Sequence, residues 1–133
     1  MKLNQVNPQY VCQLWPDVFD FLASGLPDDP EYSLDQLQMM LVRGEQTLLV
    51  AEDDGIKGAA AVSIVNHPKQ RIAFISTIGG RGISTPGMFD QLKAWAKGQG
   101  CTKLRGCTDE RMEQFWNKKL GFTTRYRVIE AGL

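Results

Sequence analysis

The stretch from Arg71 to Gly106 most limits how this chain can fold, because it reads as strand, glycine-rich turn, helix and strand in succession. Residues 71–78 are rich in β-branched and aromatic side chains, which favours a strand. Three of the four residues 79–82 are glycine, so the backbone there can adopt positive φ and leave regular structure. A threonine–proline pair at 85–86 is typical of a helix start, and the next strand is expected over Cys101–Arg105.

A strand that runs into a glycine turn and a helix N-terminus is a common arrangement for holding phosphate. The unpaired N–H groups and the helix dipole both point toward the anion. The residues that would contact it are Ile78, Gly79, Gly80, Arg81, Gly82, Ile83, Ser84 and Thr85. Arg71, Arg81 and Arg105 could also line this side of the sheet, although exposed arginines are often only solvated rim charges.

Length and composition narrow the class of protein. The 133 residues suffice for one domain, 1–133, and 15 basic side chains balance 15 acidic ones. No net charge therefore favours nucleic acid or an anionic membrane as a partner. The three cysteines form no C-x-x-C pair, so neither a metal site nor a disulfide framework is expected. No apolar run approaches the ~20 residues of a membrane span, and no signal-peptide core is visible, so we expect a cytoplasmic protein.

The remaining elements follow from local signals. A short strand is expected over Lys2–Val6, and an amphipathic helix from Pro8 that Pro16 either kinks or divides. Ser33 and Gln36 match a capping box, so a helix should begin there and end at Gly44.

A hairpin and a final helix–strand pair complete the order. Strands are expected over Thr47–Glu52 and from Ile56 to Val65, joined at an Asp-Asp-Gly turn, and Gly58–Ala61 offers little side-chain bulk. Thr108 or Asp109 should cap a last helix, followed by a strand over Phe122–Ile129. The order β-α-α-β-β-β-α-β-α-β defines an α/β protein.

This order and several strings resemble the GCN5-related N-acetyltransferase (GNAT) superfamily. The strings are Val50–Gly55 with Gly58–Ala60, Ala94–Cys101, and Phe115–Phe122 (FWNKKLGF). The resemblance implies a single-domain GNAT-like fold with a mixed, mostly antiparallel sheet. It also implies acetyl-coenzyme A (acetyl-CoA) as cofactor and an amine as acetyl acceptor. Asp109 and Trp116 occupy positions where the family contacts its coenzyme, so they join the turn residues as predicted cofactor-binding residues.

The sequence also departs from the family pattern. The family's coenzyme turn, Q/R-x-x-G-x-G/A, falls on Gly80, Ile83 and Thr85, so neither family glycine is in register. Trp116 replaces the family's usual acidic tyrosine, and its indole N–H has no usable acidity. Residues 71–78 contain no carboxylate to act as base. Glu52, Glu31 and Asp109 are possible stand-ins, although each is commonly a solvated surface group.

The remaining histidine, cysteine and methionine candidates are expected to have structural or surface roles and not catalytic ones. His67, the only histidine, is expected in a surface turn, Cys107 as a buried small residue, and Met39 and Met40 as core filler.

Two hypotheses of function follow. The first is a GNAT-like N-acetyltransferase that uses acetyl-CoA on an unknown small-molecule or protein amine through a degenerate turn. The alternative is a catalytically inactive GNAT-fold protein with a structural or binding role. The region Val18–Leu41 and the glycine turn resemble small GNAT-like proteins of tailed phages. This second resemblance implies a homo-oligomer or a virion component, made in the host cytoplasm, with other virion proteins as partners.

Overall fold

One mixed sheet with strand order β1-β2-β3-β4-β5 organises the chain in the computed structural model, which describes residues 1–133. The strands are β1 (Lys2–Gln5), β2 (Thr47–Glu52), β3 (Ile56–Asn66), β4 (Arg71–Gly79) and β5 (Lys103–Gly106). The first four pair antiparallel to their neighbours, and β5 pairs parallel to β4. A parallel pair needs a long crossover, which the helix between β4 and β5 supplies.

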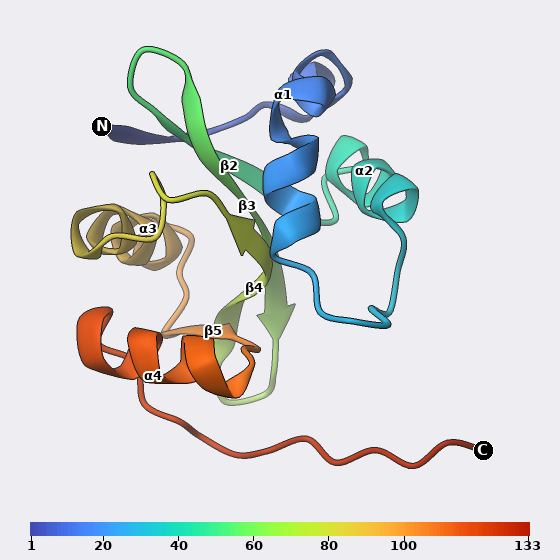
Figure 1. Cartoon of the computed structure of the whole chain (residues 1–133), viewed down its shortest axis with the longest axis vertical. Helices are drawn as coiled ribbons and strands as arrows, with labels where there is room; N and C mark the ends of the chain where they lie inside the picture. The colour runs from blue at the N-terminus through green and yellow to red at the C-terminus, as the bar shows by residue number, and fades with distance from the viewer.

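Helices cover both faces of this sheet (Figure 1). They are the 3-10 helix η1 (Pro8–Tyr10), α1 (Val11–Ser24), α2 (Leu34–Val42), α3 (Pro86–Gly98) and α4 (Glu110–Lys119). One buried cluster joins α1 and α2 to one sheet face, and a second joins α3 and α4 to the other. The predicted α/β class is confirmed.

The helix starts follow the capping signals in the sequence. The Ser33 hydroxyl accepts from the Gln36 amide at 3.1 Å, and the Ser33 amide donates to Gln36 Oε1 at 2.8 Å. The Asp109 carboxylate accepts from the Met112 amide at 2.8 Å, so Asp109 caps α4. Each cap satisfies a donor that the helix leaves free, which stabilises the protein by ~1 kcal/mol.

Two local boundaries differ from prediction. Helix α1 continues through Pro16, so the proline does not start a second helix. Strand β5 begins at Lys103, because the Cys101 amide donates to Ala96 O at 3.1 Å as part of the α3 terminus.

The predicted strand over Phe122–Ile129 is wrong. Residues 121–133 are irregular, and Figure 1 shows them running past α4 as an extended tail. The only backbone hydrogen bond from the tail joins the Phe122 amide to Trp116 O at 3.2 Å. A strand-like sequence needs an edge to pair with, and no strand of the sheet pairs with this one.

Some side-chain predictions also require correction. Cys107 is exposed, not buried, because it lies in the link between β5 and α4. Met39 is 49% exposed on the outer side of α2, whereas Met40 packs partly against the core. His67 is exposed in the β3–β4 turn, as predicted. None of the helices combines the length and the apolar character that crossing a membrane requires.

Candidate functional site

Strands β4 and β5 separate part of the way along β4. Their register runs from Ile72 opposite Lys103 to Ile75 opposite Gly106, where β5 ends. Strand β4 continues from Ser76 to Gly79 with no strand paired on that side, and the end of α1 packs on its backbone, where a Cβ atom on Gly25 would lie 2.6 Å from Ile78 N. This segment therefore presents an unpaired backbone edge, which we call the β4 notch, at the end of the sheet that leads into the glycine turn.

A β-bulge lies at the start of the β4 notch. Ala61 opposes Thr77 and Val62 opposes Ile75, so Ser76 has no register partner on β3. A bulge bends its strand and re-aims the backbone groups beside it. The bulge therefore lies at Ser76, directly after Ile75, the last β4 residue that pairs with β5.

The turn from Gly80 to Thr85 packs directly on the start of β3. A Cβ atom on Gly80, whose φ is +104°, would lie 2.7 Å from the Lys57 carbonyl oxygen. A Cβ atom on Gly82 would lie 2.9 Å from that same oxygen. Glycine is thus required at both positions by close backbone contact with β3, independently of any ligand.

Some backbone amides of the turn are already hydrogen-bonded within the protein and are not free for a ligand. The Gly82 amide donates to Lys57 O and the Ile83 amide to Gly80 O, both at 3.3 Å, and Ile83 is buried. The backbone amides of Arg81, Ser84 and Thr85 have no hydrogen-bond acceptor in the protein. The Thr85 hydroxyl caps α3 by accepting from the Met88 amide at 3.2 Å. The set of free donors is smaller than the sequence predicted, and it lies at the N-terminus of α3.

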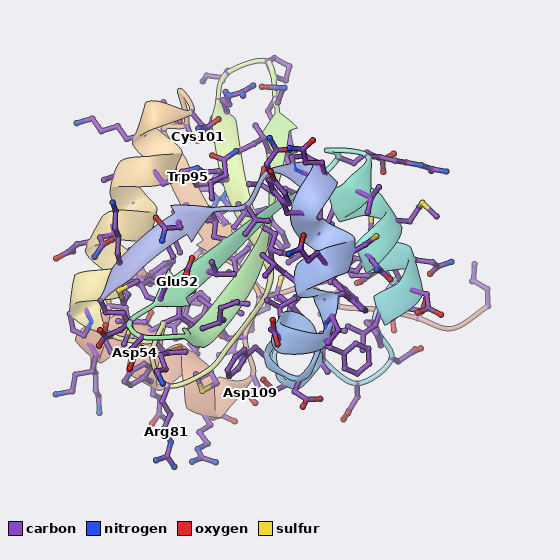
Figure 2. The ribbon with its side chains drawn as sticks, turned by 90° about the horizontal axis from the view of Figure 1, so that it is seen from above. Glu52, Asp54, Arg81, Trp95, Cys101 and Asp109 are labelled. Atoms are coloured by element: carbon purple, nitrogen blue, oxygen red, sulfur yellow. The ribbon has the colours of Figure 1, made fainter.

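The three candidate arginines do not converge. Arg81 is exposed and points outward from the turn, at the same end of the molecule as Asp54 and Asp109 (Figure 2). Arg71 begins β4 at its other end, where it donates to Gln99 O and Asn66 Oδ1, each at 2.9 Å. Arg105 faces cavities on the far side of β5. Only Arg81 is placed to meet an anion at the turn.

Trp116 belongs to the core. Its side chain is 5% exposed, and its ring centroid lies 5.5 Å from that of Phe89 and 4.9 Å from that of Phe122. A Cβ atom on Gly106 would lie 2.8 Å from the indole ring, so the indole rests on the end of β5. Packing therefore explains Trp116, as helix capping explains Asp109.

None of the three candidate carboxylates is built into the β4 notch. Glu52 ends β2, two strands from β4 and therefore on the order of 10 Å away, and it accepts from Asn4 Nδ2 at 3.2 Å. Glu31 is exposed in the α1–α2 loop, and the Asp109 carboxylate is occupied by the cap of α4. Of the candidates that the sequence suggested, the backbone amides of the turn and Arg81 remain at the notch.

Sequence reasoning missed two contributors to the site. Lys57 supplies the carbonyl that holds the turn, and Phe21 of α1 lies 3.0 Å from the position of a Gly80 Cβ. The signal that could have revealed this contact is the small-residue run Gly58–Ala61, since small residues allow a second segment to approach closely.

Comparison with solved structures identifies the class of fold. No protein-family model and no curated protein sequence matches the chain. Three matching structures are a ribosomal-protein-alanine N-acetyltransferase from Brucella melitensis biovar Abortus 2308, a probable acetyltransferase, and aminoglycoside 6'-N-acetyltransferase AAC(6')-Ih from Acinetobacter baumannii. Their TM-scores are 0.72, 0.71 and 0.68, at 14%, 18% and 18% identity.

These likenesses extend over the whole chain. They cover 100%, 100% and 99% of this chain, and 100%, 97% and 97% of the respective structures. The chain therefore has the fold of GNAT acetyltransferases, as its sequence indicated. The resemblance to tailed-phage proteins stays a prediction.

Proposed function

We propose that this protein binds acetyl-CoA at the β4 notch and transfers the acetyl group to an amine. The observation that carries the proposal is the coincidence at Ser76 of the β-bulge and the departure of β5. An unpaired strand edge leads from there into a turn with free amides. Such an edge can bind an extended, amide-containing ligand as an added strand, and a helix N-terminus can bind its phosphates.

Some of the hydrogen-bond donors of the turn are free to bind the phosphates of an anionic coenzyme. The free amides of Arg81, Ser84 and Thr85 would hold phosphate oxygens, and the Arg81 guanidinium would add a charged contact. Ile78, Gly79 and Gly80 would hold the backbone of the turn in place, while Gly82 and Ile83 keep it fixed on β3. Acetyl-CoA, when bound, supplies an activated acetyl group as a thioester.

The contribution of the chain to transfer is positioning and main-chain polarisation. Backbone amides aimed at a developing oxyanion stabilise acyl transfer without a side-chain acid. Since no carboxylate is placed as base, the acceptor amine has to arrive neutral. As its nitrogen bonds to the acetyl carbon, the C–S bond of the thioester would break, the coenzyme would leave as its thiolate, and the proton of the amine would leave to water. Trp116 packs in the core against Phe89 and Phe122 and takes no part in proton transfer.

Calorimetric titration with acetyl-CoA and with CoA tests this proposal. We expect micromolar binding that Arg81→Glu weakens about tenfold and Arg81→Lys largely preserves. Arg43→Glu is the matched control, because Arg43 is equally a surface arginine but lies beyond α2 with only Glu45 as ion-pair partner, at 4.0 Å. Absence of heat at millimolar coenzyme, with a folded protein, would overturn the proposal.

A second candidate function is a non-catalytic GNAT-fold protein with a binding or structural role, including the predicted virion component. Two observations favour it: close contact with Lys57 explains the glycines of the turn, and no side-chain base is placed at the notch. A folded protein that binds no coenzyme and co-purifies in fixed stoichiometry with a particle would support it. A coenzyme-binding protein that acetylates amines would exclude it.

A further inference from the structure

Two cavities separate the outer edge of β5 from the C-terminal tail. The first, about 540 Å³, lies between residues 102–105 and residues 121–125. The second, about 670 Å³, lies between residues 104–108 and residues 122–128. Because later tail residues face later β5 residues, the tail runs in the same direction as β5. We call the space between them the tail slot.

The two walls of the tail slot are rows of unpaired backbone groups. Strand β5 has β4 as its sole neighbour, so its outer N–H and C=O groups lack a ladder partner. The other edge of the sheet is covered, because the Leu3 amide donates to Gln91 Oε1 at 2.8 Å and Gln91 Nε2 donates to Met1 O at 3.3 Å. An uncovered edge is a template for another strand.

The tail cannot close the slot in its own chain without breaking its anchors. The Phe122 ring packs in the aromatic cluster, 5.8 Å from Phe89 and 4.9 Å from Trp116. Asn117 Nδ2 donates to the Thr124 hydroxyl at 3.1 Å. These contacts fix the start of the tail on the far wall of the slot.

Beyond these anchors the tail exposes a strand-like sequence. Tyr126, Val128 and Ile129 are 66%, 79% and 93% exposed. Aromatic and β-branched residues at such spacing are typical of a strand, yet none of their backbone groups is bonded. The chain thus carries both an unpaired edge and an unpaired strand-forming segment.

We infer that the tail slot receives the tail of a second copy of this chain. Neighbouring strands in a sheet lie about 4.8 Å apart. Because β5 and the tail of one chain run in the same direction, a strand inserted between them can pair antiparallel with both. A two-fold axis between the two tails places each tail in the other copy's slot. The strand order becomes β5, partner tail, own tail, partner β5, which closes the dimer and leaves neither wall unpaired.

Charge supports this direction of insertion. The first cavity is basic, with Lys93, Lys103 and Arg105 on its wall, whereas the second is lined by charges of both signs: Glu110, Glu113, Arg105, Arg125 and Arg127. An antiparallel tail carries the partner's Glu130 toward the basic cavity, where opposite charges attract. A parallel tail would bring Arg125 to the basic cavity, where like charges disfavour it.

Sedimentation of the whole chain with Val128 variants tests the dimer. We expect twice the chain mass for the unaltered protein and for Val128→Thr, and the chain mass for Val128→Pro, which removes a ladder N–H and fixes φ. In the single chain the Val128 backbone is unpaired, so the proline variant should keep the helical far-UV circular dichroism and cooperative unfolding of the folded domain, and lose only the strand signal of the paired tails. A monomeric unaltered protein, or a dimeric Val128→Pro variant, would overturn the inference.

A cysteine scan tests the antiparallel arrangement. The exposed Cys12 and Cys107 are first replaced by serine, and cysteine is then placed singly at each position from 124 to 130. Two antiparallel strands related by a two-fold axis bring one residue opposite its own copy, within disulfide distance. We expect covalent dimer to peak at one position and fall at its neighbours. No disulfide dimer at any position, or a series of higher oligomers, would contradict the exchange.

Discussion

The Gly82 amide donates a hydrogen bond to the Lys57 carbonyl at 3.3 Å and thereby ties the glycine turn to the first residues of β3. This close contact explains why residue 82 is glycine, although it is out of register with the glycines of the family's coenzyme turn. It also decides which amides remain free for a ligand, since those of Arg81, Ser84 and Thr85 have no acceptor. The shape of the candidate site depends on this one close approach.

Gly82→Ala should destabilise the protein by ~1–3 kcal/mol, because the added Cβ would lie 2.9 Å from Lys57 O and force the turn off β3. Urea unfolding measures the loss. Gly87→Ala is the matched control, since a Cβ there meets nothing within 4 Å. Equal stabilities for the two variants would show that the turn does not pack on β3 as described.

Thr77→Val should cost ~1–3 kcal/mol of unfolding free energy through loss of a buried hydrogen bond. The Thr77 hydroxyl is buried and donates to Leu22 O at 2.7 Å, which is the link between β4 and the end of α1. Thr102→Val, at an exposed position, should leave the midpoint of thermal unfolding nearly unchanged. A neutral Thr77→Val would mean that this buried bond contributes no stability.

Asp109→Ala should lower stability by ~1 kcal/mol because the α4 cap is lost, while Asp109→Asn keeps the cap acceptor and most of the stability. Since the carboxylate is occupied by the Met112 amide, neither variant should change the affinity for acetyl-CoA. Thermal unfolding and calorimetry on the same samples separate the two roles. A loss of coenzyme affinity without a loss of stability would assign Asp109 to the coenzyme.

The pH dependence of transfer should follow the acceptor amine. Because no carboxylate is placed as base, kcat/KM should rise about tenfold per pH unit until the amine's own pKa, near 8 for a peptide α-amine. The inflection should move when an amine of different pKa is used. An inflection that stays fixed across acceptors would reveal a base on the protein that the structure does not indicate.

Local signals were sufficient for most of the fold. The helix starts at Ser33, Thr85 and Asp109 could be predicted because an N-cap depends only on residues within one turn. The final strand over Phe122–Ile129 could not be decided in this way, because a strand exists only with an edge to pair with. That edge is either β5 of the same chain or β5 of another.

The sequence predicted the stretch that contains the free amides of the turn but not which of its amides are free. The free amides lie within the predicted stretch Ile78–Thr85, because a glycine turn before a helix start is a local pattern. The contact of Gly82 with Lys57 joins segments far apart in sequence, so no local signal could fix it. Trp116 and Asp109 were expected to contact coenzyme, whereas their contacts in the structure are core packing and capping.

We propose that acetyl-CoA binds along the β4 notch and the turn that follows it. Titration of the isotope-labelled protein with acetyl-CoA, followed by backbone amide chemical shifts, tests it most directly. We predict saturable shifts at Ser76, Arg81, Ser84 and Thr85, with little change in the α2 helix on the opposite face. Shifts confined to other surfaces, or none at millimolar coenzyme, would contradict the account.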